Sequence, residues 1–150
     1  MNLAVPPFDD VHVRRAVNLA YDAERWARIG SRHLDLSGGD FGFGTFGHLA
    51  PDGIEADLLR GERLYPFDLA VAHAQMARSG YDANGDGVCD DPVCRHIFAL
   101  ETDTGFEKFT DRVWVEGLKQ IGITLDIHRI GDFDTYNQIS LDPSRRIPLN

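Results

Sequence analysis

The apolar residues that follow Asp10 recur with the spacing of an α-helix. They fall at positions i, i+3, i+4, i+7 and i+8, which form one stripe along a helix. The stripe comprises Val13, Ala16, Val17, Ala20 and Tyr21. Pro6 and Pro7 restrict the backbone before this segment, and Asp9 or Asp10 can accept hydrogen bonds from the first free amides of a helix. The pattern therefore predicts a capped amphipathic helix that starts near residue 10.

A second helical pattern covers about residues 67–79 and follows Tyr65-Pro66. Its predicted apolar stripe comprises Leu69, Ala70, His73, Met76 and Ala77. Gly80 stands where a helix stop is expected, because glycine readily takes the left-handed conformation that ends many helices. Between the two helices, residues 31–53 contain six glycines, which argue against a long regular element there. The first half of the chain thus predicts two helices separated by a loop-rich segment.

The second half of the chain alternates between strand and helix patterns. Residues 96–100 form a short apolar run, and residues 106–120 again have helical periodicity. The predicted stripe of this helix comprises Phe106, Phe109, Val113, Gly117 and Ile121. Residues 123–128 then alternate between apolar and polar, as a half-buried strand does, and residues 132–139 predict a last helix with an early acidic cap. Strand, helix and strand in this order predict a parallel pair with a right-handed crossover.

These patterns predict an α/β fold, a layered sandwich with a small, partly parallel sheet and a βαβ crossover. The length of 150 residues suits one domain that can bury its own core. A net charge of −9 argues against nucleic-acid binding, which needs a basic face to neutralise phosphates. No apolar run approaches the length of a membrane span. The chain has no nucleophile elbow, zinc-protease motif or phosphate loop, so we expect no enzymatic activity.

The loop after Gly80-Tyr81 has the spacing of the first half of an EF-hand calcium loop. Oxygen ligands alternate there, and a glycine at the sixth position permits the sharp turn. The candidate ligands are Asp82, Asn84, Asp86, the carbonyl of Val88, and Asp90. Val93 occupies the twelfth position, where a bidentate Glu belongs, and no helix pattern follows, so a full EF-hand is excluded. One interpretation is a structural Ca²⁺ bound at about 10⁻⁴–10⁻³ M, with no cofactor otherwise required. The other is a solvated acidic turn.

The segment from Asn2 to Asp22 also carries a motif beyond its helical pattern. A Pro-Pro-Phe run follows an Asn and precedes a helix of the form Asp-Val-x-Val-Arg-x-Ala-hydrophobic-Asn-x-Ala-hydrophobic-Asp. The matching residues are Asn2, Pro6, Pro7, Phe8, Asp10, Val11, Val13, Arg14, Ala16, Asn18, Ala20 and Asp22. This run resembles the extracellular solute-binding proteins of the oligopeptide, dipeptide and nickel type (family 5), which are the ligand receptors of ABC importers.

The resemblance continues later in the chain and covers about residues 2–140. The later matches are Tyr65, Pro66, Phe67, Asp68, Ala72, Gly80-Tyr81 and Ile121-Gly122-Ile123. It implies that residues 1–150 form a single domain, a partial ligand-closing lobe from the second, C-terminal half of a larger two-lobed receptor. Because the Pro-Pro-Phe segment of such receptors lies in mid-chain and no signal peptide precedes it here, we expect an internal segment of a longer protein.

The resemblance implies a function in solute capture. The expected role is the substrate-binding component of an ABC-type importer, which captures peptides or similar small solutes by lobe closure and delivers them to a membrane permease. The expected partners are the solute and the ABC permease subunits. The expected location is periplasmic or extracellular at the cell surface, with membrane contact only through the permease or a lipid anchor outside this segment. The alternative is a calcium-stabilised extracellular interaction module centred on the acidic loop, and a small hydrolase is a weaker third hypothesis.

Within such a receptor, the glycine-rich loop is the candidate lining of the solute cleft. Phe41, Phe43 and Phe46 can offer stacking surfaces to a peptide, or they can pack beneath the loop as ordinary apolar side chains. Arg14 and Asn18 help to identify the family, yet we expect them to serve the scaffold rather than to contact solute.

The two cysteines of the chain, Cys89 and Cys94, flank the acidic loop. In an exported protein they are expected to form a small disulfide loop worth about 2 kcal/mol. A zinc site that adds His96 and His73 fits no standard ligand spacing. Two free thiols are the remaining alternative.

Overall fold

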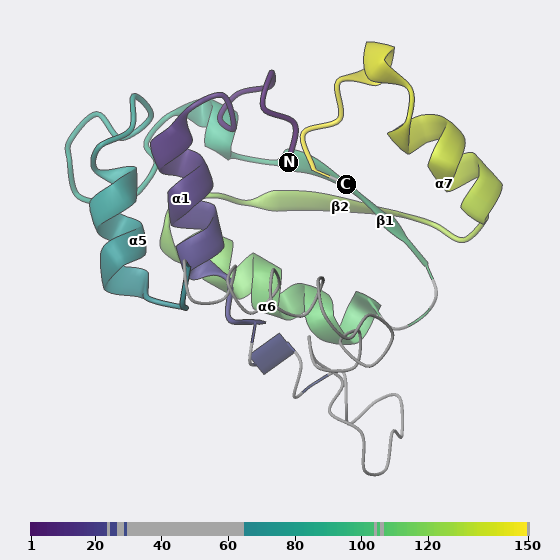
Figure 1. Cartoon of the computed structure of the whole chain (residues 1–150), viewed down its shortest axis with the longest axis horizontal. Coiled ribbons are helices and arrows are strands. Elements are labelled where there is room, and N and C mark those ends of the chain that lie inside the picture. The colour runs from purple at the N-terminus through teal and green to yellow at the C-terminus, as the bar shows by residue number, and fades with distance from the viewer. Residues whose placement is uncertain (24, 27–28, 30–64, 104, 106, 150) are drawn as a thin grey trace, which may run out of the picture.

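The computed structural model describes residues 1–23, 25–26, 29, 65–103, 105 and 107–149 (Figure 1). In chain order, the regular elements are α1 (Val11–Ala20), α5 (Leu69–Met76), the 3₁₀ turn η1 (Pro92–Cys94), β1 (Ile97–Thr102), α6 (Glu107–Gln120), β2 (Leu125–Ile130), α7 (Phe133–Ser140) and the 3₁₀ turn η2 (Pro143–Arg145). The helix predicted after Asp10 and the strand–helix–strand order of the second half are therefore confirmed.

β1 and β2 form a two-stranded parallel sheet, and α6 connects them. The register pairs Ile97 with Leu125 at the start of the strands and Thr102 with Ile130 at their ends. Figure 1 shows α6 along one face of the sheet and α7 over the other. This arrangement confirms the predicted α/β class with a small parallel sheet and a helix between its strands.

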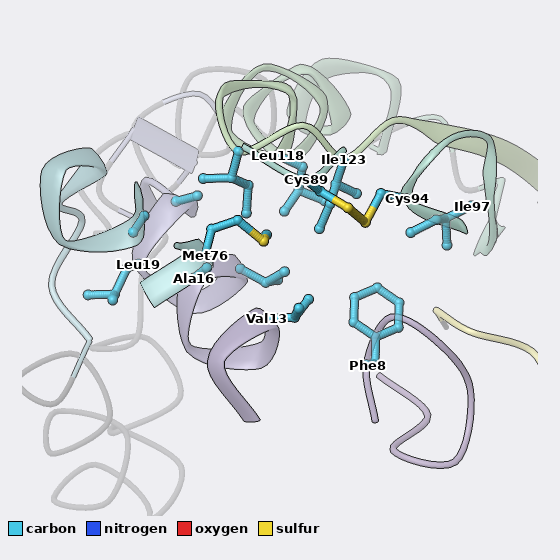
Figure 2. Packing of buried hydrophobic residues seen from close by; sticks show 14 residues of the cluster. Phe8, Val13, Ala16, Leu19, Met76, Cys89, Cys94, Ile97, Leu118 and Ile123 are labelled. Carbon is cyan, nitrogen blue, oxygen red and sulfur yellow. A yellow bond between two sulfur atoms is a disulfide. The ribbon is translucent and has the colours of Figure 1, made fainter. Parts of the chain in front are cut away.

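The core lies where α1, α5 and α6 meet the beginning of the sheet (Figure 2). Its most buried members include Phe8, Val13, Ala16, Val17, Ala72, Met76, Leu118, Ile121 and Ile123. Burial of each larger aliphatic or aromatic side chain contributes about 1.5–3 kcal/mol before the entropy cost of ordering it. The stripe predicted for the first helix faces this core, and its last member, Tyr21, stacks on Trp114 of α6 with ring centroids 4.2 Å apart.

A glycine allows α1 and α6 to approach closely. A Cβ atom on Gly117 of α6 would lie only 2.1 Å from the carbonyl oxygen of Ala20 at the end of α1. No side chain fits at that distance, so the crossing of the two helices depends on the missing Cβ.

The second helix is shorter than its pattern predicts, and it presents a different face to the core. Asp68 caps it by accepting a hydrogen bond from the Val71 amide (3.0 Å), and the helix ends at Met76. Ala72 and Met76, one turn apart, are fully buried, whereas Ala70 is exposed. The predicted stripe was therefore wrong at Ala70, because nearly every position of this helix is apolar and the sequence alone does not select the buried face.

Candidate functional site

The two parallel strands end at the same edge of the sheet, next to the beginnings of α6 and α7. The amide of Asp103, just after β1, donates to the carbonyl of Ile130 at the end of β2 (3.0 Å). In open α/β sheets, ligands bind outside the carboxyl ends of the strands. We call this region, residues 101–103 and 129–133, the carboxyl edge, and we treat it as the candidate solute-facing surface.

An exposed aromatic side chain stands at the carboxyl edge. Phe133 is the first residue of α7, is 65% exposed, and stacks on Tyr136 with ring centroids 6.2 Å apart. Asp132 caps α7 by accepting a hydrogen bond from the Thr135 amide (2.8 Å), which fixes the first turn of the helix just beyond β2. No residue of α7 is buried. The ring therefore offers an open apolar face of the kind that lines ligand sites.

A network of polar side chains connects this edge to α6. The guanidinium of Arg129, on β2, contacts the carboxylate of Asp111, on α6, and its Nε lies 3.7 Å from Oε2 of Glu101, on β1. Beside them, the Thr102 hydroxyl donates to the Glu107 carboxylate (2.6 Å). Burial raises the pKa of Glu101, Arg129 opposes that shift, and the negative charge of Glu107 adds to it. These contacts tie the ends of both strands to the first half of α6.

A hollow of about 190 Å³ lies near the termini, between the N-terminal segment and the turn after α7. Its lining includes Asn2, Ser140, Asp142 and Arg146. Pockets for small organic ligands usually enclose about 300–1,000 Å³ and are mostly apolar. This polar hollow is smaller than that, so it is a weaker candidate than the carboxyl edge.

The three phenylalanines proposed from the sequence as the cleft lining, Phe41, Phe43 and Phe46, lie outside the described residues. Their contact with a solute stays a prediction.

The acidic loop is folded around Asp82. This residue is 8% exposed, and its two carboxylate oxygens accept hydrogen bonds from the amides of Gly85 and Gly87, each at 2.7 Å. The carbonyl oxygen of Gly87 also lies within hydrogen-bond distance of Nδ1 of His73 on α5 (2.8 Å). A Cβ atom on Gly87 would lie 2.7 Å from the Cβ of His73, so the loop packs closely on α5.

The remaining proposed calcium ligands form local hydrogen bonds within the loop. Asp86 accepts from the Val88 amide (2.9 Å) and from the Asn84 side chain (3.1 Å), and Asp90 accepts from the Asn84 amide (3.3 Å). Across the described residues, no group of three or more His, Cys, Asp or Glu side chains is arranged to hold a metal ion. Calcium binding by Asp82, Asn84, Asp86, Val88 and Asp90 stays a prediction.

Cys89 and Cys94 form a disulfide in the structure, and both are buried. The Cys89 amide donates to the carbonyl of Ile121, just after α6 (3.0 Å), and the Thr124 amide donates to the carbonyl of Cys94 (3.0 Å). The disulfide loop is thereby joined to the segment that leads from α6 into β2. A bonded pair of sulfurs leaves no thiolate for the zinc alternative.

The motif residues of the first helix make contacts within the scaffold. Arg14 donates through Nη1 to the carbonyls of Phe8 (2.8 Å) and Asp9 (3.0 Å), which closes the turn after the two prolines. Asn18 donates to the carbonyl of Arg14 (2.9 Å). Asp10 caps α1 and also accepts from the Gly80 amide (3.0 Å), which joins α1 to the end of the α5 region.

Sequence reasoning missed the residues of the carboxyl edge. A signal for Arg129 was present, because continuing the alternation of Leu125 and Ile127 places it on the inward face of β2. A charged residue on the inward face of a strand indicates that an ion-pair partner lies near it. Phe133 carried no comparable signal, because the sequence does not show whether the first residue of α7 is buried or exposed.

The geometry first defines a class: an α/β lobe whose parallel strands end at an open edge where a solute can bind. The chain belongs to the bacterial extracellular solute-binding proteins of family 5, because the model of the family's middle region ("family 5 Middle") matches residues 1–143. Comparison with curated proteins and with solved structures gave no match.

Members of this family are non-enzymatic components of ABC import systems, which bind solutes and deliver them to permeases. The expectations of solute binding and of no enzymatic activity are thus confirmed at the level of the family. In the part of the chain that the structure describes, no helix is long and apolar enough to cross a membrane.

Proposed function

We propose that this chain is a ligand-closing lobe of an ABC importer's substrate-binding component, and that it captures peptides or similar small solutes at its carboxyl edge. The observation that carries the proposal is the exposed ring of Phe133, at the edge where both parallel strands end, in a chain that matches family 5. A rigid aromatic face stacks on flat or apolar groups with little entropy cost, and peptide bonds and side chains both provide such groups.

Charge at the edge favours solutes with a cationic end. Asp103, just after β1, and Asp134, in the first turn of α7, are both exposed, and the chain as a whole has a net charge of −9. A negative rim raises the local concentration of positively charged solutes and speeds their association. A peptide with a free amino terminus fits this environment better than an anionic solute of the same size.

The proposed mechanism is closure of two lobes around the solute. A solute that contacts both lobes binds the closed state more tightly than the open one, so it shifts the population toward closure. The closed receptor then presents its solute to the permease, in the periplasm or at the cell surface. This chain supplies one wall of the cleft, so it should bind a solute weakly by itself.

Nuclear magnetic resonance tests the location of the site without requiring tight binding. The chain is titrated with a pool of short peptides at millimolar concentration, and amide shifts are followed in the wild type and in two variants, Phe133→Ala and Phe67→Ala. We expect shifts at Asp103, Gly131 and Phe133 that Phe133→Ala reduces several-fold. Phe67, on the approach to α5, is 47% exposed and so provides a matched control whose removal should leave those shifts unchanged.

Shifts at the carboxyl edge that persist in Phe133→Ala would mean that another side chain carries the contact. Shifts confined to other surfaces, or equal losses in both variants, would contradict the proposed site. Micromolar binding by this chain alone would contradict the view that it forms only one wall of the cleft.

A further inference from the structure

A polar triad that the proposed solute contact does not use links the carboxyl edge to α6. It consists of Glu101 on β1, Asp111 on α6 and Arg129 on β2, whose side chains are 24%, 10% and 33% exposed. Glu101 and Arg129 are direct partners in the parallel register, so both point toward α6. The triad therefore joins three elements at one place.

The triad has two carboxylates for one guanidinium. Among the described residues, Oε2 of Glu101 and Oδ2 of Asp111 are buried and have no hydrogen-bond partner, so their favourable contact is the ionic one with Arg129. An ionised carboxylate that is buried without hydrogen bonds is costly unless a close counter-ion compensates it. Asp111 touches the guanidinium, whereas Glu101 lies 3.7 Å from it. The positive charge of Arg129 therefore compensates the negative charge of Glu101 less well than that of Asp111.

The charged groups that face Glu101 come from the two neighbouring elements. Arg129 faces it from β2, and Asp111 and Glu107 face it from α6. The helix α7 covers the opposite face of the sheet (Figure 1). Burial is the largest cause of the raised pKa of Glu101, Arg129 opposes the shift, and Glu107 reinforces it.

We propose that Glu101 is a proton-sensitive switch in this fold: as the pH falls it binds a proton, Arg129 then pairs with Asp111 alone, and the ends of β1 and β2 become more stable. This inference concerns the fold and does not depend on the proposed solute site. The direction of the stability change follows from the thermodynamic linkage between proton binding and folding. Because the folded state binds this proton more tightly than the unfolded state, the stability contributed by Glu101 rises as pH falls through its raised pKa. The gain is complete once the pH has fallen below the ordinary glutamate pKa.

The test compares unfolding free energies of the wild type, Glu101→Gln and Glu116→Gln from about pH 4 to pH 8. We expect Glu101→Gln to be more stable than the wild type at neutral pH, with a difference that shrinks as the wild type takes up its proton. Glu116→Gln is the control, for which we expect the opposite change in stability at neutral pH. Glu116 is an exposed residue of α6 whose pKa is lowered by its hydrogen bond to Arg25, so Glu116→Gln should be less stable at neutral pH.

A second measurement, on the wild type itself, holds even if a variant fails to fold. The carboxyl carbon resonance of Glu101 is followed through a pH titration, and we expect its midpoint to lie above that of an exposed glutamate. A midpoint at or below the ordinary value would overturn the proposal. So would a Glu101→Gln variant that differs from the wild type by the same amount at every pH.

Discussion

Removal of the disulfide should weaken one specific region of the fold. The bond between Cys89 and Cys94 closes a short loop whose backbone is joined to Ile121 and Thr124. The amide of Ile97, the first residue of β1, donates to the carbonyl of Thr124 (2.8 Å). The double variant Cys89→Ala/Cys94→Ala therefore loosens the place where α6, β1 and β2 meet, without leaving an unpaired thiol.

The expected loss of unfolding free energy in the double variant has two parts. The cysteines are separated by 5 positions, and the chain-entropy model gives about 2 kcal/mol for so short a loop. Cys94 is 0% exposed and Cys89 is 6% exposed, so loss of each sulfur also removes core packing, at about 0.5–1.5 kcal/mol per site. The total is about 3–5 kcal/mol. In a chain of this size, about 2–4 °C of melting temperature corresponds to each kcal/mol, so the midpoint should fall by roughly 10 °C.

Urea unfolding and amide hydrogen exchange together measure this effect. We expect reduced protection at Cys89, Ile97 and Thr124, and unchanged protection at Tyr136, whose amide lies in α7 away from the loop. A reducing agent should destabilise the wild type and leave the double variant unchanged, which is the internal control. An unfolding free energy within about 0.5 kcal/mol of the wild type, well below the entropy term alone, would refute this reasoning.

Two further predictions concern packing and the acidic loop. Gly117→Ala should lower the unfolding free energy by about 1–3 kcal/mol or more, the usual size of overpacking losses, because the added Cβ would meet the carbonyl oxygen of Ala20. Gly131→Ala is the control, because no atom lies within 4 Å of its added Cβ. Equal effects of the two changes would contradict the close crossing of α1 and α6. Calcium at about 10 mM should raise the unfolding free energy by no more than about 2.7 kcal/mol, the limit for a site of about 10⁻⁴ M, and by about 1.4 kcal/mol if the site is millimolar. A larger gain, lost in Asp86→Asn, would instead favour the calcium-stabilised interaction module.

The sequence predicted those parts of the fold in which local pattern and tertiary packing agree. Val13, Ala16 and Val17 form a clear stripe between polar residues, and the same residues are buried. The alternation around Leu125 and Ile127 likewise predicted β2, and the helix before it required a parallel partner. In these segments only one face is apolar enough to enter the core, so the pattern determines the orientation.

The sequence did not predict features that depend on which segments become neighbours. Ala70 and Ala72 are equally apolar, and only packing against α1 selects Ala72 for the core. Glu101 and Arg129 are separated by the whole of α6, and they meet because the parallel register pairs them. The triad at the carboxyl edge is therefore a product of topology, although each member is an ordinary charged residue in the sequence.

The residues that identify the family and the residues proposed to meet solute occupy different parts of the fold, for a physical reason. Arg14 and Asn18 bind carbonyl groups of their own turn and helix, so a change at either would alter the start of the lobe whatever the solute. Phe133 is 65% exposed at the beginning of α7, and its neighbours restrict its size very little. Substitution there can change the contact surface while the core stays intact. A receptor built in this way can acquire a new solute preference by changes at the carboxyl edge alone, because the stability of the lobe is supplied elsewhere.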